Sequence, residues 1–468
     1  MNKPAMLALV LTPAALFADP SVERVIVRQQ WPWSTDVKVE YSLSGVGAAH
    51  PVDISVRAFN DGVELPSANL NAAITGDRYG ITDAVGSLTI DPVKAFGTSQ
   101  VALGSFTVQL SLSASSANIG EVLYKIYDLT SGGYTDVTRA DLLNGKYGSV
   151  ETDFGAIGTG FTTSLDPADI IIWTGVTNYP GAKTTKLVMR KIAAKNKSFH
   201  MGSYSPGSPD PVQDYTHNSA DEFYFEMTLT NDYWIGVFEL TKKQYDLIAN
   251  KSTATEETAA LPQTAIDTYS GIRGTPSDWT GWPADIYAVS SESFIQTCRT
   301  KIPGVKFDLP TEAQWEYACR AGSAYQYYVG YRTGAKATCQ AAVQMIANCS
   351  ENGNGGVVAV GSYLPNAFGL YDMLGNVSEA TRDLFDPSTG TLNGTQIVLP
   401  PLTAAATDPA GWLDAAAVTT NSACGMLFRG GNWFRDYTWC RCPGRREGYL
   451  LTGHYASRFG LRLWAVAD

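Results

Sequence analysis

Basic residues are scarce in this sequence, and they never form a run. The 34 lysines and arginines are outnumbered by 45 aspartates and glutamates, which gives a formal net charge of −11. Nucleic acids and anionic membrane surfaces bind proteins through clustered positive charge. The sequence therefore argues against nucleic acid and against a charged membrane surface as partners.

Long apolar runs are also missing. Beyond the N-terminus, no stretch reaches the ~20 apolar residues of a membrane-spanning helix. The N-terminus itself has a basic residue at Lys3, a short apolar region over residues 5–17, and Ala18 ahead of Asp19. This order is typical of a signal peptide cleaved after Ala18. We therefore expect a signal peptide at residues 1–18, a secreted or periplasmic protein, and no membrane span.

Side chains that bind metals tightly are few and scattered. The four histidines lie at positions 50, 200, 217 and 454, and the seven cysteines have no zinc-finger spacing. A structural zinc site needs four such ligands close together, so none is expected. Because the number of cysteines is odd, at least one thiol stays unpaired in an oxidising compartment.

The first part of the chain carries a β-pattern. A chain of 468 residues is too long for one ordinary core, so we expect two or three domains. Apolar and polar residues alternate over residues 37–43, 52–58 and 106–112, as in half-buried strands. Residues 21–165 are thus predicted to form an immunoglobulin-like sandwich that acts as a spacer or docking module. A linker is expected at residues 166–185.

Residues 186–468 show a mixed pattern of predicted strands and helices. Strands are predicted at 186–192 and 233–240, and a helix at 290–298. Two further helices begin with capping boxes, Thr241 with Gln244 and Thr311 with Gln314. Glycine-rich and aromatic loops dominate after that. The pattern indicates an α+β domain with little regular structure.

One segment of this domain, residues 428–445, concentrates aromatic, arginine and cysteine side chains. They follow two adjacent glycines, Gly430 and Gly431. Glycine adopts backbone conformations that other residues resist, so a tight turn is expected here. The segment is therefore a candidate functional site.

Several short blocks stand out in this domain: residues 199–202 (FHMG), 233–247, 309–318 (LPTEAQWEYA), 365–377 (PNAFGLYDMLGNV), 428–431 (FRGG) and 459–462 (FGLR). Together they resemble the formylglycine-generating enzyme family, also called sulfatase-modifying factors. They occur in the order found in the family. The resemblance covers residues 186–468 and leaves the N-terminal β-domain outside. It implies a C-type-lectin-like fold with two or three helices.

The resemblance also implies where a copper site would lie. Formylglycine-generating enzymes hold copper(I) with two thiolates, four and nine positions after the double glycine. Here these positions are Arg435 and Cys440. A guanidinium offers only hydrogen-bond donors and cannot bind a metal. Cys442 could lie ~6.6 Å from Cys440 on one face of an extended strand, but pairing with Cys424 or burial are the other possibilities.

Calcium is the second implied cofactor. Residues 372–379 are similar to the family's calcium loop, with carboxylates from Asp372 and Glu379 and carbonyl groups from Gly375 and Val377. Calcium takes six to eight oxygen ligands, and such a loop supplies them. A second, amide-rich site would use these residues: Asn348, the carbonyl of Cys349, Asn352 and the carbonyl of Asn354.

Three functions follow from these residues. The first is an exported module that binds a protein, peptide or small molecule, since aromatic and arginine side chains suit recognition. Its expected contacts are Asn432, Phe434, Arg435, Tyr437 and Trp439. The second is an active copper-dependent oxidoreductase that generates formylglycine or oxidises a thiol through Cys440. The third resembles the variable ligand-binding proteins of diversity-generating retroelements, which carry this fold and vary its C-terminal segment.

Overall fold

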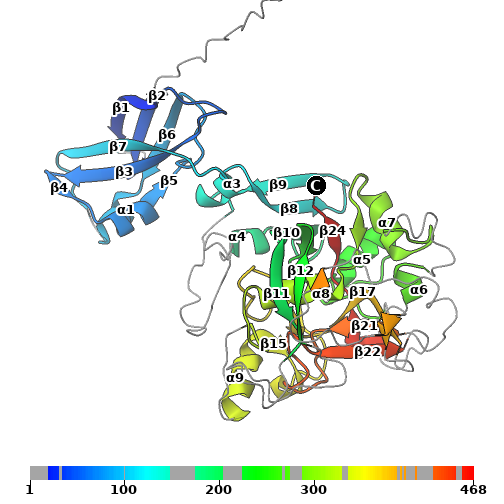
Figure 1. Ribbon diagram of the computed structural model, residues 1–468. Coiled ribbons are helices and arrows are strands. Elements are labelled where there is room, and N and C mark those ends of the chain that lie inside the picture. Colours follow the sequence, from blue (N-terminus) through cyan, green and yellow to red (C-terminus); the bar gives the residue numbers. More distant parts are fainter. Residues whose placement is uncertain are drawn as a thin grey trace, which may run out of the picture. The chain divides into compact units, whose positions relative to one another are not determined.

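Figure 1 shows the computed structural model of the chain. It describes residues 19–30, 34–99, 101–147, 174–203, 224–265, 269–274, 287–328, 336–386, 391–392, 395–396, 406–407, 425–449 and 456–467. The predicted signal peptide and the first part of the predicted linker lie outside these residues. The chain divides into two compact units. One comprises Met1–Glu121 with Thr138–Lys146, and the other comprises Val122–Val137 with Tyr147–Asp468.

The N-terminal unit contains two antiparallel sheets. The four-stranded sheet has the order β1-β2-β6-β5, and the three-stranded sheet has the order β4-β3-β7. The elements of this unit are β1 (Ser21–Gln29), β2 (Val37–Ser44), β3 (Val52–Asn60), β4 (Val63–Glu64), α1 (Ser67–Ala73), β5 (Ile74–Thr75), β6 (Val85–Ile90), α2 (Pro92–Phe96), β7 (Phe106–Ala114) and α3 (Arg139–Leu143).

One apolar core is shared by the two sheets of this unit. Every second residue of β2 is buried, and β3 repeats the pattern, because successive strand side chains point to opposite faces. The buried residues of both strands belong to the same cluster. The three predicted strands are therefore confirmed as β2, β3 and β7, while the immunoglobulin-type arrangement stays a prediction.

The C-terminal unit mixes short helices with strands, which confirms the expected mixed class. Its first elements are β8 (Val122–Asp128), β9 (Tyr134–Thr138), α4 (Thr174–Thr177), β10 (Lys186–Ile192), β11 (Lys197–Met201), β12 (Phe225–Leu229), β13 (Tyr233–Gly236), α5 (Lys242–Ala249), α6 (Tyr269–Ile272), α7 (Phe294–Lys301), β14 (Phe307–Asp308) and α8 (Glu312–Arg320). Then follow α9 (Lys336–Ile346), β15 (Ala347–Asn348), η3 (Ser350–Asn352), β16 (Leu374–Gly375), β17 (Ser378–Asp386), β18 (Thr391–Leu392), β19 (Thr395–Gln396), β20 (Ala406–Thr407), β21 (Gly425–Arg429), β22 (Arg445–Tyr449), η4 (Ala456–Arg458), β23 (Phe459–Gly460) and β24 (Trp464–Val466).

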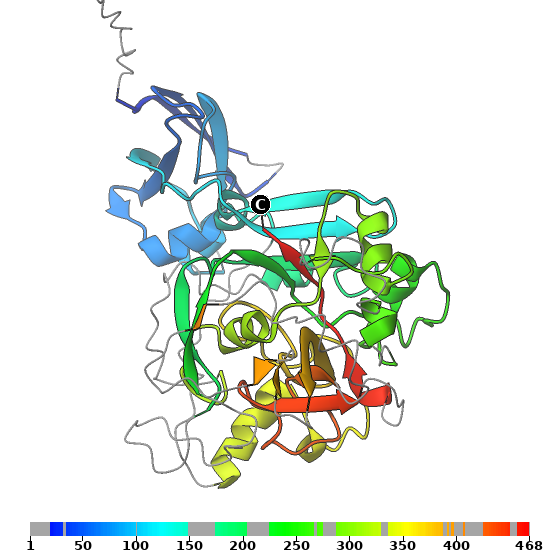
Figure 2. The ribbon, with the colours of Figure 1, turned by 45° about the vertical axis from the view of Figure 1, so that its right-hand side comes forward.

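The β8–β9 hairpin extends the main sheet of this second unit. The sheet has the order β14-β24-β13-β10-β8-β9, and the hairpin lies beside β10 in Figures 1 and 2. Tyr127 of β8 is buried and contacts Phe307 edge to face, with ring centres 5.5 Å apart. Residues 122–137 fall within the predicted N-terminal domain. The structure instead groups them with the C-terminal unit, where Tyr127 and Leu129 belong to a buried core cluster.

The capped helices form where the sequence predicts them. The Thr241 and Thr311 hydroxyls accept hydrogen bonds from the backbone N–H groups of Gln244 and Gln314. The side-chain oxygen of each glutamine accepts in turn from the backbone N–H of its threonine. These contacts satisfy backbone groups that a helix start leaves unpaired. The helix expected at 290–298 begins later, as α7, because Ser293 caps it. Among the described residues, no helix is long and apolar enough to cross a membrane.

Candidate functional site

Three segments that the sequence singled out meet at one place. We call them the Asn348 turn (residues 348–354), the Asp372 turn (residues 372–379) and the aromatic loop (residues 430–444). Asn348 and Gly375 are paired in parallel between β15 and β16. The Gly375 N–H donates to the carbonyl of Gly430 over 2.8 Å, and the Trp433 N–H donates to that of Asn376 over 3.0 Å. Backbone hydrogen bonds thus join all three.

The two glycines at the start of the aromatic loop are required by its geometry. Gly430 and Gly431 have φ values of +89° and +73°, a region that L side chains avoid. A Cβ atom on Gly431 would also lie 2.8 Å from the Cys440 sulfur. The loop therefore folds back on itself tightly, as expected from the sequence.

Arg429 closes the base of the aromatic loop. Its buried guanidinium donates to the carbonyl groups of Cys442, Pro443 and Gly444 at 2.8–3.1 Å. It also forms an ion pair with Glu316 of α8. Because Gly430 follows Arg429 directly in the chain and residues 442–444 are hydrogen-bonded to its guanidinium, both ends of the loop are anchored at Arg429.

Part of the aromatic loop faces outward. Phe434 is 49% exposed and Trp439 is 38% exposed. The Arg435 guanidinium lies 4.7 Å from the centre of the Trp439 ring, and the Arg458 guanidinium lies 3.5 Å from that of Phe434. Stacked arginine and aromatic side chains attract each other through the negative ring face. They make a surface with both apolar area and positive charge.

Two residues predicted as ligand contacts serve the loop instead. Asn432 is buried, and its side chain donates to Ser378 and accepts from the Phe434 N–H. Tyr437 is half-buried against the core, and its carbonyl accepts from the Tyr327 hydroxyl. The Asn432 side chain therefore holds the loop backbone, and Tyr437 packs on the core beside it.

Cys440 lies beneath this surface. Its side chain is fully buried, and burial, together with nearby Cys349, raises the pKa of its thiol well above the usual range. The thiolate is the reactive and metal-binding form of cysteine. Arg435 stands where the family resemblance places the other copper thiol, and its guanidinium lies over the Trp439 ring.

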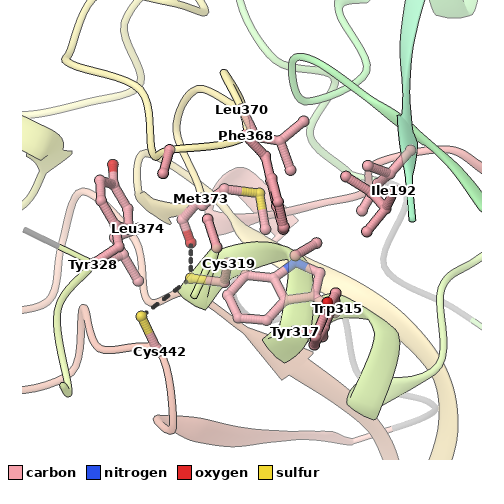
Figure 3. Close-up of a cluster of buried hydrophobic side chains, with 14 of the residues drawn as sticks. Ile192, Trp315, Tyr317, Cys319, Tyr328, Phe368, Leu370, Met373, Leu374 and Cys442 are labelled. Carbon is pink, nitrogen blue, oxygen red and sulfur yellow. Dashed lines mark hydrogen bonds between the residues drawn. The ribbon is translucent and has the colours of Figure 1, made fainter. Parts of the chain in front are cut away.

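Cys442 has Cys319 of α8 as its neighbour, whereas the sequence suggested Cys440 or Cys424. Its sulfur lies 3.4 Å from that of Cys319 in α8, and both thiols are buried and free. Figure 3 shows the pair beside Met373 and Trp315. Cys424, one possible partner, lies outside the described residues. Cys442 therefore packs into the core beside α8.

The Asp372 turn is buried and rich in charge. One oxygen of Asp372 accepts from the Gly361 N–H over 2.5 Å, while Oδ1 has no hydrogen-bond partner in the described structure. Burial raises the pKa of Asp372 to about 6. A buried carboxylate oxygen without a partner is costly, so this atom fits a cation ligand.

Glu379, the second predicted carboxylate ligand, is already neutralised. Arg462 donates to both of its oxygens at 2.6–3.1 Å, and the Trp315 ring N–H donates over 2.7 Å. All three groups are buried. Glu379 therefore fits a cation less well than Asp372 does.

Glu239 is a carboxylate of this cluster that the sequence analysis missed. It is buried and accepts from the side chain of Asn376 and from the Val377 N–H. Burial, with the negative charges of Asp372 and Glu379, raises its pKa well above the usual value. An acid inside the apolar run 235–240 was the available signal.

The Asn348 turn is closed by its own amides. The Asn352 side chain accepts from the N–H and the thiol of Cys349, and Asn354 donates to the Asn348 side chain over 2.9 Å. The four residues predicted for a second calcium site thus lie together with partnered amides. Among the described residues, no three His, Cys, Asp or Glu side chains surround a common metal position. A calcium ion at either turn would therefore need backbone oxygens as well.

Known proteins similar to this chain cover parts of it. A formylglycine-generating enzyme from Mus musculus is 38% identical over 80 residues, 16% of this chain and 22% of that enzyme. The one from Streptomyces coelicolor is 38% identical over 86 residues, 17% and 27% of the two chains. The matches thus span about a quarter of the curated relatives.

Two solved structures are more distant. PvdO from Pseudomonas aeruginosa is 18% identical with a TM-score of 0.40 and covers 60% of this chain and 95% of its own. Treponema denticola variable protein 1 has the same identity and TM-score and covers 60% and 96%. The family description that matches the chain, over residues 201–465, is the sulfatase-modifying factor enzyme 1-like domain. This match covers more than half of the sequence, and the chain therefore belongs to the sulfatase-modifying factor family.

Proposed function

We propose that the family domain of this chain is a ligand-binding module and not a copper oxidase. The aromatic loop is its binding surface, with Phe434, Arg435 and Trp439 as contacts. The observation that carries the proposal is the Arg435–Trp439 stack, at 4.7 Å, where the family resemblance places a copper ligand. An arginine there supplies recognition in place of metal chemistry.

The donor set argues against copper(I). Soft thiolates are the ligands that copper(I) prefers. Cys440 is buried, and its raised thiol pKa disfavours the thiolate. Cys442 lies next to Cys319 in the core. A second thiol for Cys440 would have to come from a rearranged loop.

The fixed shape of the loop supports a binding role. Its ends are held by Arg429, and the N–H of Ser350 donates to the Arg435 carbonyl over 2.8 Å. A preorganised surface loses less conformational entropy when a ligand binds. Aromatic and arginine side chains on such a surface are the types that dominate binding energy.

The test is an activity assay on the full chain. Copper(I) is added to the wild type and to Cys440→Ser, together with a cysteine peptide of the sulfatase type. Mass spectrometry then measures conversion of the thiol to an aldehyde. We expect no conversion in either protein. Conversion by the wild type that Cys440→Ser abolishes would overturn the proposal and establish the copper oxidoreductase.

We further propose that the Asp372 turn binds calcium. Asp372 would supply a carboxylate oxygen, and Gly375 and Val377 would supply carbonyl oxygens. The supporting observation is the buried, unpartnered Oδ1 of Asp372 in a cluster with two other buried carboxylates. Calcium would add positive charge to that of Arg462 and Lys183 beside these three carboxylates.

Export is the last part of the proposed function. The order of Lys3, the apolar residues 5–17 and Ala18 supports a cleaved signal peptide. Fractionation of cells that express the chain, with N-terminal sequencing, is the measurement. A mature protein that begins at Asp19 outside the cytoplasm is expected. An intact N-terminus in the cytoplasm would contradict export.

A further inference from the structure

The N-terminal unit, to which the family match does not extend, contains a polar cavity of about 520 Å³. The volume lies within the range of small-molecule sites, about 300–1,000 Å³. Its walls come from β2, from the segment between β5 and β6, and from α3 with the residues after it. The polar and aromatic residues that line it include Tyr41, Asp77, Tyr79, Asp83, Asp141 and Lys146.

Negative charge in this cavity is only partly compensated. The ammonium group of Lys146 is paired with Asp141 over 2.9 Å, and Asp141 also caps α3. Asp77 and Asp83 are exposed and have no hydrogen bond or ion pair with the described residues. Two carboxylates therefore face the cavity without a counter-charge.

Tyr41 gives the second, independent sign of a ligand. Its side chain is 94% buried, and it packs so closely on Gly86 that a Cβ atom there would overlap its hydroxyl. That hydroxyl has no hydrogen-bond partner in the described structure. Burial and the nearby charges of Asp77 and Asp83 raise the pKa of Tyr41. Tyr41 lines the cavity, so a ligand donor there could pair with this hydroxyl.

We propose that this cavity binds the cationic side chain of an arginine or lysine in a basic peptide segment. Asp77 and Asp83 would pair with the cation, and the Tyr41 hydroxyl would accept one of its N–H groups. Guanidinium groups match carboxylates in geometry and stack on aromatic rings. The structure already holds one such stack at the rim, where the Arg78 guanidinium lies 5.5 Å from the centre of the Tyr79 ring.

A bare divalent ion fits the cavity less well. Calcium and similar ions require six to eight oxygens within a small sphere. Only two unpaired carboxylates are present here, and they share a space sized for an organic group. The charge and the volume together favour a side chain.

The test uses the full chain and three probes, namely Nα-acetyl-arginine amide, its neutral isostere Nα-acetyl-citrulline amide, and calcium chloride. Binding is followed by NMR shifts of residues around the cavity. We expect saturable binding of the arginine amide at low salt, and none of the citrulline amide. Equal binding of both amides, or shifts with calcium alone, would overturn the proposal.

Substitutions of the cavity residues test whether the arginine amide binds there. The double variant Asp77→Asn, Asp83→Asn should weaken binding of the arginine amide about tenfold or more. Tyr41→Phe should weaken it about threefold without lowering the unfolding temperature, because the hydroxyl has no partner to lose. Glu64→Gln, an exposed acid paired with Arg57 outside the cavity, is the matched control. Weakening by Glu64→Gln to the same extent would contradict the assignment.

Discussion

The guanidinium of Arg435 lies over the Trp439 ring, 4.7 Å from its centre. A second arginine, Arg458, lies 3.5 Å from the ring centre of Phe434. Phe434 and Arg435 are adjacent in the aromatic loop. The backbone of this part of the loop is hydrogen-bonded to Ser350 of the Asn348 turn and to Asn376 of the Asp372 turn. The position that the family resemblance assigns to a metal ligand is therefore occupied by an arginine stacked on an aromatic ring.

Asn432 and Phe434 should respond differently to truncation. Asn432→Ala removes buried hydrogen bonds to Ser378 and to the loop backbone, so we expect a loss of about 1–3 kcal/mol in the free energy of unfolding. Phe434→Ala changes a side chain that is 49% exposed, and about 0.5 kcal/mol or less is expected. Urea unfolding measures both. Equal losses would show that Asn432 does not hold the loop.

Cys319 and Cys442 should form a disulfide under oxidising conditions. Their sulfurs are 3.4 Å apart and join segments separated by 123 residues. Closing so long a loop stabilises the folded state by about 2–4 kcal/mol. Mass spectrometry of the oxidised wild type should show the loss of two hydrogen atoms, with a higher unfolding temperature. The control Cys298→Ser should keep both effects. Persistence of both effects in Cys442→Ser would exclude this pair.

Calcium should stabilise the wild type through Asp372. A ligand at about 100 times its Kd raises the free energy of unfolding by about 2.7 kcal/mol. Chelator should therefore lower the unfolding temperature of the wild type and leave that of Asp372→Asn unchanged. Asp436→Asn, an exposed acid of the aromatic loop, should behave as the wild type. The site is ruled out if chelator has no effect on the wild type.

The β8–β9 hairpin should be essential to the C-terminal unit. Tyr127 is buried against Phe307, whereas Tyr134 of the same hairpin is 57% exposed. Tyr127→Ala leaves a large void and should cost about 3–5 kcal/mol, and Tyr134→Ala about 1 kcal/mol or less. Denaturant unfolding followed by tryptophan fluorescence compares the two. Similar small effects would mean that the hairpin contributes little.

Much of the local structure could be predicted from the sequence. The capping boxes at Thr241 and Thr311 depend on residues three positions apart, and the strands β2, β3 and β10 depend on local patterns. The placement of the β8–β9 hairpin could not. Its alternating pattern is the same whichever sheet it joins, because period-two burial does not identify the partner strand.

The candidate site was predictable in its parts and not in its arrangement. The double glycine indicated a turn, and the resemblance indicated Asp372 and Cys440. Asn432 is predicted as a ligand contact of the aromatic loop, and only the structure shows its buried partners. Arg429 and Glu239 act through contacts across more than ten residues of sequence, which no local pattern reveals.

The most direct test of the binding-surface account is a copper(I) titration against a coloured chelator. Wild type, Arg435→Cys and the control Thr438→Cys are compared. We predict that the wild type and Thr438→Cys take no copper from the chelator. Arg435→Cys should bind one equivalent, because it adds a second thiol at the position where the family resemblance places one, and copper(I) held by two sulfurs displaces the thiol proton of Cys440. One equivalent bound by the wild type, and lost in Cys440→Ser, would contradict the account.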